Sequence, residues 1–340
     1  MKKQTMIINI VIVLIVFGVF AGGIWAYTFY TDKVNEKPAL AWEGLVEIPS
    51  GTTTTGIGRI LEDEGVIANA DTFIWYCKIN KFDGRLKAGK YKLDSKMSLE
   101  EIATTLLEGR EHLVSIMVPP GRRIEETAFD VEKSGVFTAK EFLAACENGD
   151  PHGRIPDAYS LEGYLYPETY MVSPSTSVEE FVAIMVDKYF EVMDETALSE
   201  LKTMGITERD ALIIASIVER EAMKDNERPK VAAVFYNRMD QKMRMESCAT
   251  VIYAIGYVPD ELSQQDIETN SPYNTYKVAG LPPGPICSPG EASLEAAIRP
   301  ANVDYLFFAS NGDGTHTFTT SYAEHVAHRR IVEEQQKYNK

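Results

Sequence analysis

Basic residues are scarce in this sequence of 340 residues. The chain has 34 lysines and arginines against 50 aspartates and glutamates, so its formal net charge is −16. No long run of lysine or arginine interrupts this acidic composition. Because binding to nucleic-acid phosphates requires a basic surface, the composition argues against a nucleic-acid partner.

Residues that commonly bind metals are also few, with 4 cysteines and 5 histidines. His316 and His325 lie in one segment near the C-terminus, and no third ligand is spaced close to them. Since zinc sites need at least three protein ligands, we expect these histidines to form hydrogen bonds and not to bind a metal. Cys77 and Cys146 lie in different segments and are expected to be lone buried thiols.

Apolar residues are plentiful, and the first long run of them begins near the N-terminus. Residues 6–30 contain no charged side chain, whereas Lys2 and Lys3 lie in the short tail 1–5. About 20 apolar residues suffice to span a bilayer, so 6–30 predicts a single transmembrane anchor. The positive-inside rule then leaves the N-terminus in the cytoplasm and the body of the chain outside the cell membrane. A cleaved signal peptide is the alternative, because Ala21-Gly22-Gly23 is small enough for cleavage.

The remaining chain, which is 45% hydrophobic and 25% charged over its whole length, can form a sizeable core and more than one domain. After a polar linker at 31–44, residues 45–110 predict a small β-α-α-β module, followed by a third helix that begins at Ser98 and ends at Gly109. Ser98 and Glu101 have the spacing of a capping box. The module is either a binding module or a packing domain.

Residues 111–340 predict a larger domain that mixes helices and strands, so that the whole chain is α+β. The predicted elements include a long amphipathic helix over Val178–Met204 and a strand over Asp304–Ala309. Two polar loops punctuated by proline and glycine, 271–276 and 280–290, are long enough to line a site.

The helix predicted over Thr207–Asn226 differs from the others because it is apolar on every side, as buried helices are. Its middle nevertheless carries Glu219, Arg220 and Glu221 in a row. A carboxyl in an apolar setting can be kept protonated near neutral pH, as general acid catalysis requires. Alternatively, the helix leaves the core at this point and Arg220 neutralises a neighbouring carboxylate.

Several short motifs occur in an order that resembles a known family. They are SLEGYLYPETY at 160–170, ASIVEREA at 215–222, VFYNRM at 234–239, SPYNTY at 271–276, GLPPGPICSPG at 280–290 and HTFTTSYAEH at 316–325. With the N-terminal anchor, this series resembles the bacterial endolytic murein transglycosylases, the YceG-like family. The resemblance implies a LysM-like, glycan-binding module at 45–110 and a catalytic domain at 111–340.

The resemblance also implies a reaction. Such enzymes cleave the β-1,4 bond between N-acetylmuramic acid and N-acetylglucosamine in peptidoglycan without water and leave a 1,6-anhydro end. One carboxyl serves as general acid and then as base, and no metal or cofactor is needed. The implied role would be to end the growth of nascent strands, beside peptidoglycan synthases. The open alternatives are a hydrolase with a second carboxylate such as Glu162, and a non-catalytic glycan-binding scaffold.

Glu219 is the catalytic residue that the resemblance implies, because the family motif reads IVEKE and its first glutamate acts. Glu219 and Glu221 lie about 200° apart around a helix, so they are not expected to face one pocket. The expected substrate contacts are Glu162, Ser247, Thr250, Asn274 and Tyr276.

One stretch departs from the family pattern. By the family pattern, many relatives are expected to carry Asp-Pro or Asp-Ala where this chain has Cys248-Ala249, and a residue other than cysteine at position 287. If an aspartate at position 248 assists the acid, that assistance is missing here. Cys248 and Cys287 lie in the two expected site loops outside the membrane, where a disulfide between them is possible.

Overall fold

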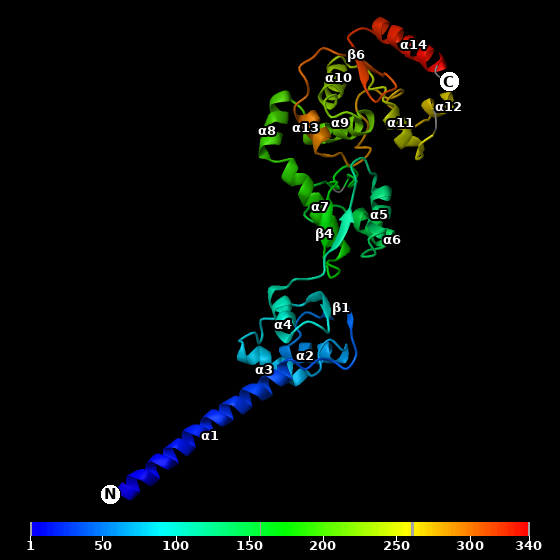
Figure 1. Cartoon of the computed structure of the whole chain (residues 1–340). Helices are drawn as coiled ribbons and strands as arrows, with labels where there is room; N and C mark the ends of the chain where they lie inside the picture. Colours follow the sequence, from blue (N-terminus) through cyan, green and yellow to red (C-terminus); the bar gives the residue numbers. More distant parts are fainter. Residues whose placement is uncertain (1, 157, 260–261, 339–340) are drawn as a thin grey trace. The chain divides into compact units, whose positions relative to one another are not determined.

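The computed structural model describes residues 2–156, 158–259 and 262–338. Met1 of the expected cytoplasmic tail and the last two residues lie outside the described part. The chain forms two compact units: the first runs to Leu113 and includes Ser173–Ser175, and the second comprises Val114–Val172 and the chain from Thr176 onward (Figure 1).

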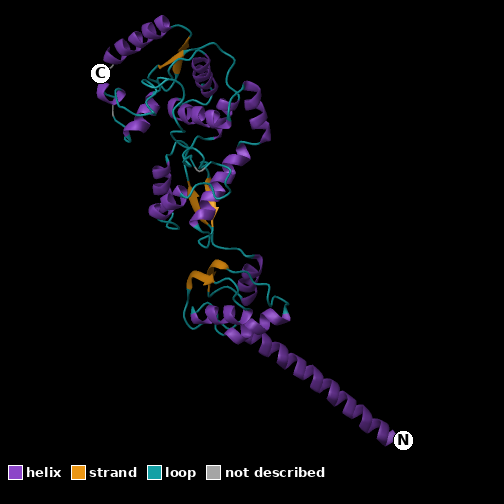
Figure 2. Ribbon diagram, turned by 180° about the vertical axis from the view of Figure 1, so that it is seen from behind, coloured by secondary structure: helices purple, strands orange, loops and turns teal. Residues whose placement is uncertain are grey.

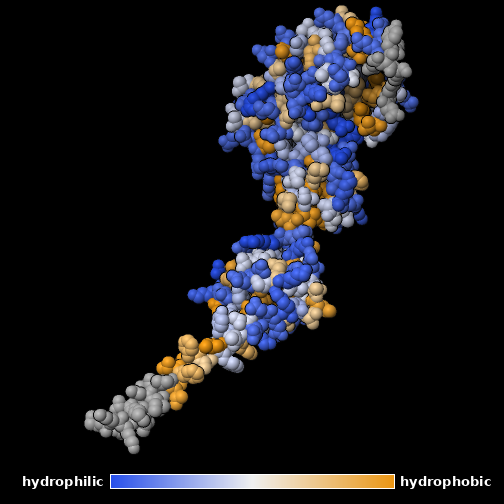
Figure 3. All heavy atoms as spheres, viewed as in Figure 1, coloured by the Kyte–Doolittle hydropathy of each residue, from blue (hydrophilic) through white to orange (hydrophobic). Residues whose placement is uncertain are grey.

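The first element is the apolar helix α1 (Lys2–Val34). Within it, Leu14–Val34 is long and apolar enough to cross a membrane, and Figure 3 shows its hydrophobic surface in orange. A single helix of this kind is compatible with a membrane anchor or a signal sequence. The helix continues into the expected linker 31–44, because no proline or glycine occurs there before Pro38.

The rest of the first unit has the predicted order of elements. They are β1 (Glu43–Ile48), α2 (Thr54–Asp63), α3 (Ala70–Ile79), β2 (Gly89–Asp94) and α4 (Leu99–Glu108). The two strands pair antiparallel, with Val46 opposite Tyr91, and both side chains are buried. The capping box of Ser98 and Glu101 is confirmed, and α4 ends at Gly109 in the left-handed region.

The second unit confirms a mixed α+β architecture, with two two-stranded antiparallel sheets that Figure 2 shows in orange among many helices. Its strands are β3 (Val114–Met117), β4 (Thr169–Val172), β5 (Phe307–Ser310) and β6 (His316–Thr319), with β3 paired to β4 and β5 to β6. Its helices are α5 (Ile124–Glu132), α6 (Ala139–Glu147), α7 (Val178–Val192), α8 (Glu195–Met204), α9 (Glu208–Glu221), α10 (Arg228–Asp240), α11 (Cys248–Ile255), α12 (Gln264–Ile267), α13 (Glu291–Ile298) and α14 (Tyr322–Tyr338).

The prediction of one long helix over Val178–Met204 is wrong, because the segment forms two helices, α7 and α8. Met193 leaves the helical region with φ −84° and ψ 59°. Asp194 then starts α8, since its Oδ1 accepts a hydrogen bond of 2.8 Å from the amide of Ala197. An aspartate that caps a new helix competes with continuation of the old one.

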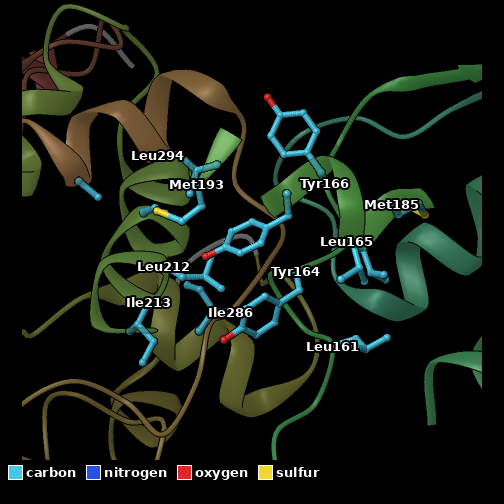
Figure 4. Packing of buried hydrophobic residues seen from close by; sticks show 14 of the residues in the cluster. Leu161, Tyr164, Leu165, Tyr166, Met185, Met193, Leu212, Ile213, Ile286 and Leu294 are labelled. Carbon is cyan, nitrogen blue, oxygen red and sulfur yellow. The ribbon is translucent and has the colours of Figure 1, made fainter. Parts of the chain in front are cut away.

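Helix α9 is the centre of the second unit, where it packs against α13 and α10 (Figure 1). Every residue from Ala211 to Val218 is buried, as the apolar pattern predicts, and Figure 4 shows Leu212 and Ile213 within the cluster around it. The predicted cap at Thr207 is confirmed by its 3.1 Å bond from the Asp210 amide. The helix ends at Glu221 and not at Asn226, because Ala222 adopts an extended conformation.

Candidate functional site

The C-terminal end of α9 borders a groove of about 530 Å³. Its wall also includes Arg238 of α10, Met245, Glu246 and Tyr276, together with residues from the start of α11, the sheet of β5 and β6, and α14. The polar side chains that line it include Glu221, Arg238, Cys248, Tyr276, His316, His325 and Arg329.

Glu221 brings a carboxyl to this groove at the last position of α9. Its Oε1 accepts a hydrogen bond of 2.5 Å from the Ser247 hydroxyl and a long one of 3.5 Å from the Ala249 amide. Ser247 precedes α11 as its N-terminal flanking residue, but its side chain makes no capping bond. The Ser247 hydroxyl is therefore directed to Glu221 and not to its own helix.

Glu219 has a different environment and is not among the residues that line this groove. Its side chain is 10% exposed, and its Oε2 accepts bonds from the Gly290 amide at 3.0 Å and the Ser293 hydroxyl at 2.8 Å. The guanidinium of Arg228 lies 3.3 Å from the same oxygen. Within the described part of the chain, no hydrogen bond reaches Oε1.

The two glutamates thus have separate partners, as their spacing on a helix predicts. The expectation that Arg220 neutralises a neighbour is not met, because Arg220 is exposed and bonds the carbonyl of Gly121 at 3.3 Å. Arg228 of α10 takes that place beside Glu219, and its side chain is only 11% exposed.

Three of the expected contact residues hold the groove together. Thr250 is fully buried and bonds the Ser247 carbonyl and the Thr275 hydroxyl, each at 2.8 Å. Asn274 is also fully buried, and its amide group donates to the carbonyls of Ile267 and Thr269. The Asn274 bonds hold the 267–276 loop together, and Thr275 joins that loop to Thr250 of α11 and to the Ser247 amide, which fixes Ser247 beside Glu221.

Tyr276 is the expected contact residue that lies on the groove wall beside Cys248. Its hydroxyl lies 3.1 Å from the Cys248 sulfur, at the position where relatives are expected to carry an aspartate. Burial and the neighbouring Cys248 raise the pKa of the Tyr276 hydroxyl above its ordinary value, so this phenol is neutral near pH 7.

The disulfide between Cys248 and Cys287 that the sequence left possible is not formed, because both cysteines are free. Cys287 is fully buried, and its thiol donates to the carbonyl of Ser216 in the middle of α9. Cys248 is exposed and lines the groove. Cys77 and Cys146 are buried and free, as predicted.

The two histidines near the C-terminus have separate roles. His316 Nδ1 lies 2.8 Å from Glu227 Oε2, which confirms a hydrogen-bonding role. His325 instead stacks on Phe307, its Nδ1 has no partner among the described residues, and burial lowers its pKa. Within the described residues no group of three histidine, cysteine, aspartate or glutamate side chains is placed to hold a metal ion.

Glu162 lies apart from this groove, on the wall of a second cavity that also includes Tyr253. The residue is 5% exposed, and burial, together with Glu125, raises the pKa of its carboxyl to about 8. Sequence reasoning selected Glu162 as a site residue, but the structure does not bring it to the same cavity as Glu221.

Sequence reasoning missed Arg228, Ser293 and Glu227. Arg228 and Ser293 bind Glu219 from 9 and 74 positions away, and Glu227 pairs with a histidine 89 positions later. No local pattern marks such pairs. The motif ending at Gly290 did mark the loop that provides the amide bond to Glu219.

The fold and the groove define a mixed α+β protein with a carboxyl group at the end of a buried helix, the type of site that serves general acid–base chemistry. The chain belongs to the YceG-like family, whose model matches residues 46–331.

Curated relatives agree with this assignment. The chain is 34% identical over 297 residues to an endolytic murein transglycosylase of Bacillus subtilis, covering 82% of each protein. It is 31% identical over 327 residues to an endolytic murein transglycosylase of Streptococcus pneumoniae, covering 86% of this chain and 58% of that relative. The crystal structure of a YceG-like protein from Listeria monocytogenes superimposes with a TM-score of 0.57 at 32% identity, covering 85% of this chain and 99% of that one.

Proposed function

We propose that this protein is a peptidoglycan lytic transglycosylase that cleaves glycan strands internally. The observation that carries the proposal is the Glu221 carboxyl on the wall of the groove, held by Ser247. Family membership and the names of the curated relatives support the same reaction class.

The proposed reaction needs one carboxyl. In its protonated form the carboxyl donates a proton to the oxygen that leaves when the bond between N-acetylmuramic acid and N-acetylglucosamine breaks. The resulting carboxylate then takes the proton from the C6 hydroxyl of the muramic residue. The C6 oxygen attacks the anomeric carbon of its own ring, which yields a 1,6-anhydro end and restores the acid. A water-based mechanism would instead require a second carboxylate at a set separation.

Two glutamates compete for this role. Glu219 is the residue that the family resemblance implies, and its assignment stays a prediction. We favour Glu221, because it lines the groove whereas Glu219 is held by an arginine and a backbone amide. Those two partners of Glu219 only donate, so they favour its carboxylate form, although the Ser293 hydroxyl that also bonds Glu219 can donate or accept. Ser247 can donate to the carboxylate of Glu221 and accept from its acid form, so it serves both states of the cycle.

The other groove residues would then position the acid and the sugar. Ser247 orients Glu221, and the buried Thr250 and Asn274 hold Ser247 in place and do not touch the glycan. Tyr276 offers an aromatic ring on the groove wall, which suits packing against a sugar ring.

We further propose that α1 is an uncleaved anchor with its N-terminus in the cytoplasm, so that the groove lies outside the membrane. Its length and apolar surface support this arrangement. The substrate would then be nascent glycan strands near peptidoglycan synthases. The first unit, as a LysM-like module, would bind those strands. Shortened glycan strands in cells that express an anchored protein, and not in cells that express one lacking α1, would support the arrangement.

Product analysis tests the proposed reaction. The full-length protein in detergent micelles is incubated with purified peptidoglycan, and the released fragments are analysed by mass spectrometry. We expect 1,6-anhydro ends. Fragments heavier by one water would show the hydrolase, and binding without any cleavage would show the glycan-binding scaffold.

A further inference from the structure

The second cavity, of about 560 Å³, has the size of a small-ligand site and contains none of the groove residues that serve the proposed reaction. Its wall comes from the start of α5, the end of α6, the loop before Glu162, and α11. The chemically distinctive residues on it are Glu125, Glu147, Tyr159, Glu162 and Tyr253.

Glu162 is the unusual member of this set. Only 5% of the residue is exposed, and its Oε1 has no hydrogen-bond partner among the described residues. Its Oε2 accepts a long bond of 3.4 Å from the Tyr253 hydroxyl, and the backbone amide of Ile124 also interacts with the carboxyl. A buried carboxyl oxygen without a partner costs free energy, so its presence on a cavity wall indicates a ligand group that would satisfy it.

The charged side chains that line this cavity are all acidic. Glu125 and Glu147 are exposed carboxylates on its wall, and no lysine or arginine is among the described residues that line it. Two arginines outside the lining contact its aromatic rings. The guanidinium of Arg123 stacks on the Tyr253 ring at 4.8 Å and donates to the carbonyl of Ile252, and that of Arg209 stacks on the Tyr159 ring at 3.5 Å.

From this geometry we propose that the cavity is a binding site for a primary ammonium group, with Glu162 as its buried partner and Glu125 and Glu147 as carboxylates that attract it. An ammonium has three donors and no acceptor, which matches a site of carboxyl and phenol oxygens. A neutral sugar would leave the two exposed carboxylates without a complementary group. The source of the ammonium group would be the diamino acid of a peptidoglycan peptide stem, which carries such an amine. This identification rests on the proposed function.

Binding of an ammonium would also change the protonation of Glu162. Burial and Glu125 raise the pKa of this carboxyl to about 8, opposed by the Ile124 amide, Arg123 and the Tyr253 hydroxyl. Two further titratable neighbours, Cys146 and Tyr273, are neutral near pH 7, because burial raises the pKa of each. At pH 7 the empty site therefore holds a proton on Glu162, and that proton leaves when an ammonium pairs with the carboxylate.

Calorimetry of the full-length protein in detergent micelles tests the site without any cleavage step. The probe is acetyl-Lys-D-Ala-D-Ala, titrated at pH 7 in two buffers of different ionisation enthalpy, and its matched control is the same peptide acetylated on Nε. We expect the acetylated peptide to bind at least tenfold more weakly. We also expect that binding of the peptide with the free amine releases nearly one proton per peptide from the parent protein. The Glu162→Gln protein should release none.

The Glu147→Gln variant keeps the test decisive if Glu162→Gln fails to fold, because Glu147 is exposed. It should weaken amine binding several-fold and leave the melting temperature unchanged. Equal affinity for both peptides would overturn the proposal. So would a cavity that binds an N-acetylglucosamine tetramer instead of the amine, with the tetramer's affinity depending on Glu162. Neither result bears on the anhydro products, so failure of this site and failure of the proposed reaction are distinguishable.

Discussion

The Ser247 hydroxyl lies 2.5 Å from Oε1 of Glu221, although 26 positions separate the two residues in the chain. A hydrogen bond to a charged group contributes about 1.5–3 kcal/mol. We therefore predict that Ser247→Ala lowers kcat by about tenfold or more with little change in KM, since the bond orients the acid and does not hold the glycan.

The matched control is Ser247→Thr, which retains the hydroxyl. Because the Ser247 side chain makes no capping bond to α11, the alanine variant should still fold, and its stability should fall only by the lost bond to Glu221. An alanine variant that retains full kcat would contradict the role given to this bond.

The pair of Glu219 and Arg228 predicts a large effect on stability. Both side chains are about nine-tenths buried, and removal of one partner from such a pair leaves an uncompensated charge. Arg228→Met should lower the free energy of unfolding by about 3 kcal/mol, measured by urea unfolding.

Arg299→Met is the comparison for that variant, because Arg299 pairs with Glu200 and Glu295 at an exposed position. Its effect should be much smaller, as is usual for surface ion pairs. Equal effects of the two substitutions would show that the contact with Glu219 does not stabilise the fold.

The buried carboxyl of Glu162 should make the stability of the fold depend on pH. Its pKa rises from 4.5 to about 8 on folding, so the folded state binds the proton more tightly than the unfolded state. The stability that this proton provides is complete below pH 4.5 and is lost as the pH rises toward 8. The difference in unfolding free energy between the parent and Glu162→Gln should therefore fall by a few kcal/mol between pH 5 and pH 8.5, at no more than about 1.4 kcal/mol per pH unit.

Urea unfolding of both proteins across that pH range measures this difference, since the other titrating groups affect both alike. A difference that stays constant with pH would show that Glu162 is ionised in the folded protein.

Substitution of Gly163, in the loop before β4, should destabilise the fold through a steric clash. Its φ is +86°, and a Cβ there would lie 2.5 Å from Cβ of Pro285. Gly153 has a similar φ of +67°, but a Cβ there would meet nothing within 4 Å. Gly153→Ala should cost about 1 kcal/mol from backbone strain alone, and Gly163→Ala should cost clearly more because Pro285 must move. Similar melting temperatures for the two variants would contradict this reading.

Local patterns in the sequence predicted the local features of the fold. The caps at Ser98 and Thr207 and the all-round apolar character of α9 follow from short-range rules. The break at Met193 was missed, because an amphipathic pattern continues through Asp194 and conceals its role as a cap.

The candidate site was only partly predictable. The motifs identified the loops that surround Glu219 and Glu221, but not which partner each glutamate has. Those partners come from elements far along the chain, and their choice depends on how α10, α11 and α13 pack on α9. The same limit explains why the sequence could not decide the disulfide, since the Cys287 thiol bonds the Ser216 carbonyl and the Cys248 sulfur lies beside the Tyr276 hydroxyl.

The central claim is that Glu221 supplies the proton for glycan cleavage, and comparison of Glu221→Gln with Glu219→Gln tests it most directly. The rate at which 1,6-anhydro ends form on purified peptidoglycan is measured for each folded variant by mass spectrometry. We predict that Glu221→Gln loses at least a thousandfold in rate. Glu219→Gln should retain measurable cleavage, because the amide oxygen can still accept from Gly290 and Ser293. Loss of all product in Glu219→Gln with cleavage retained in Glu221→Gln would contradict the account and return the acid to Glu219.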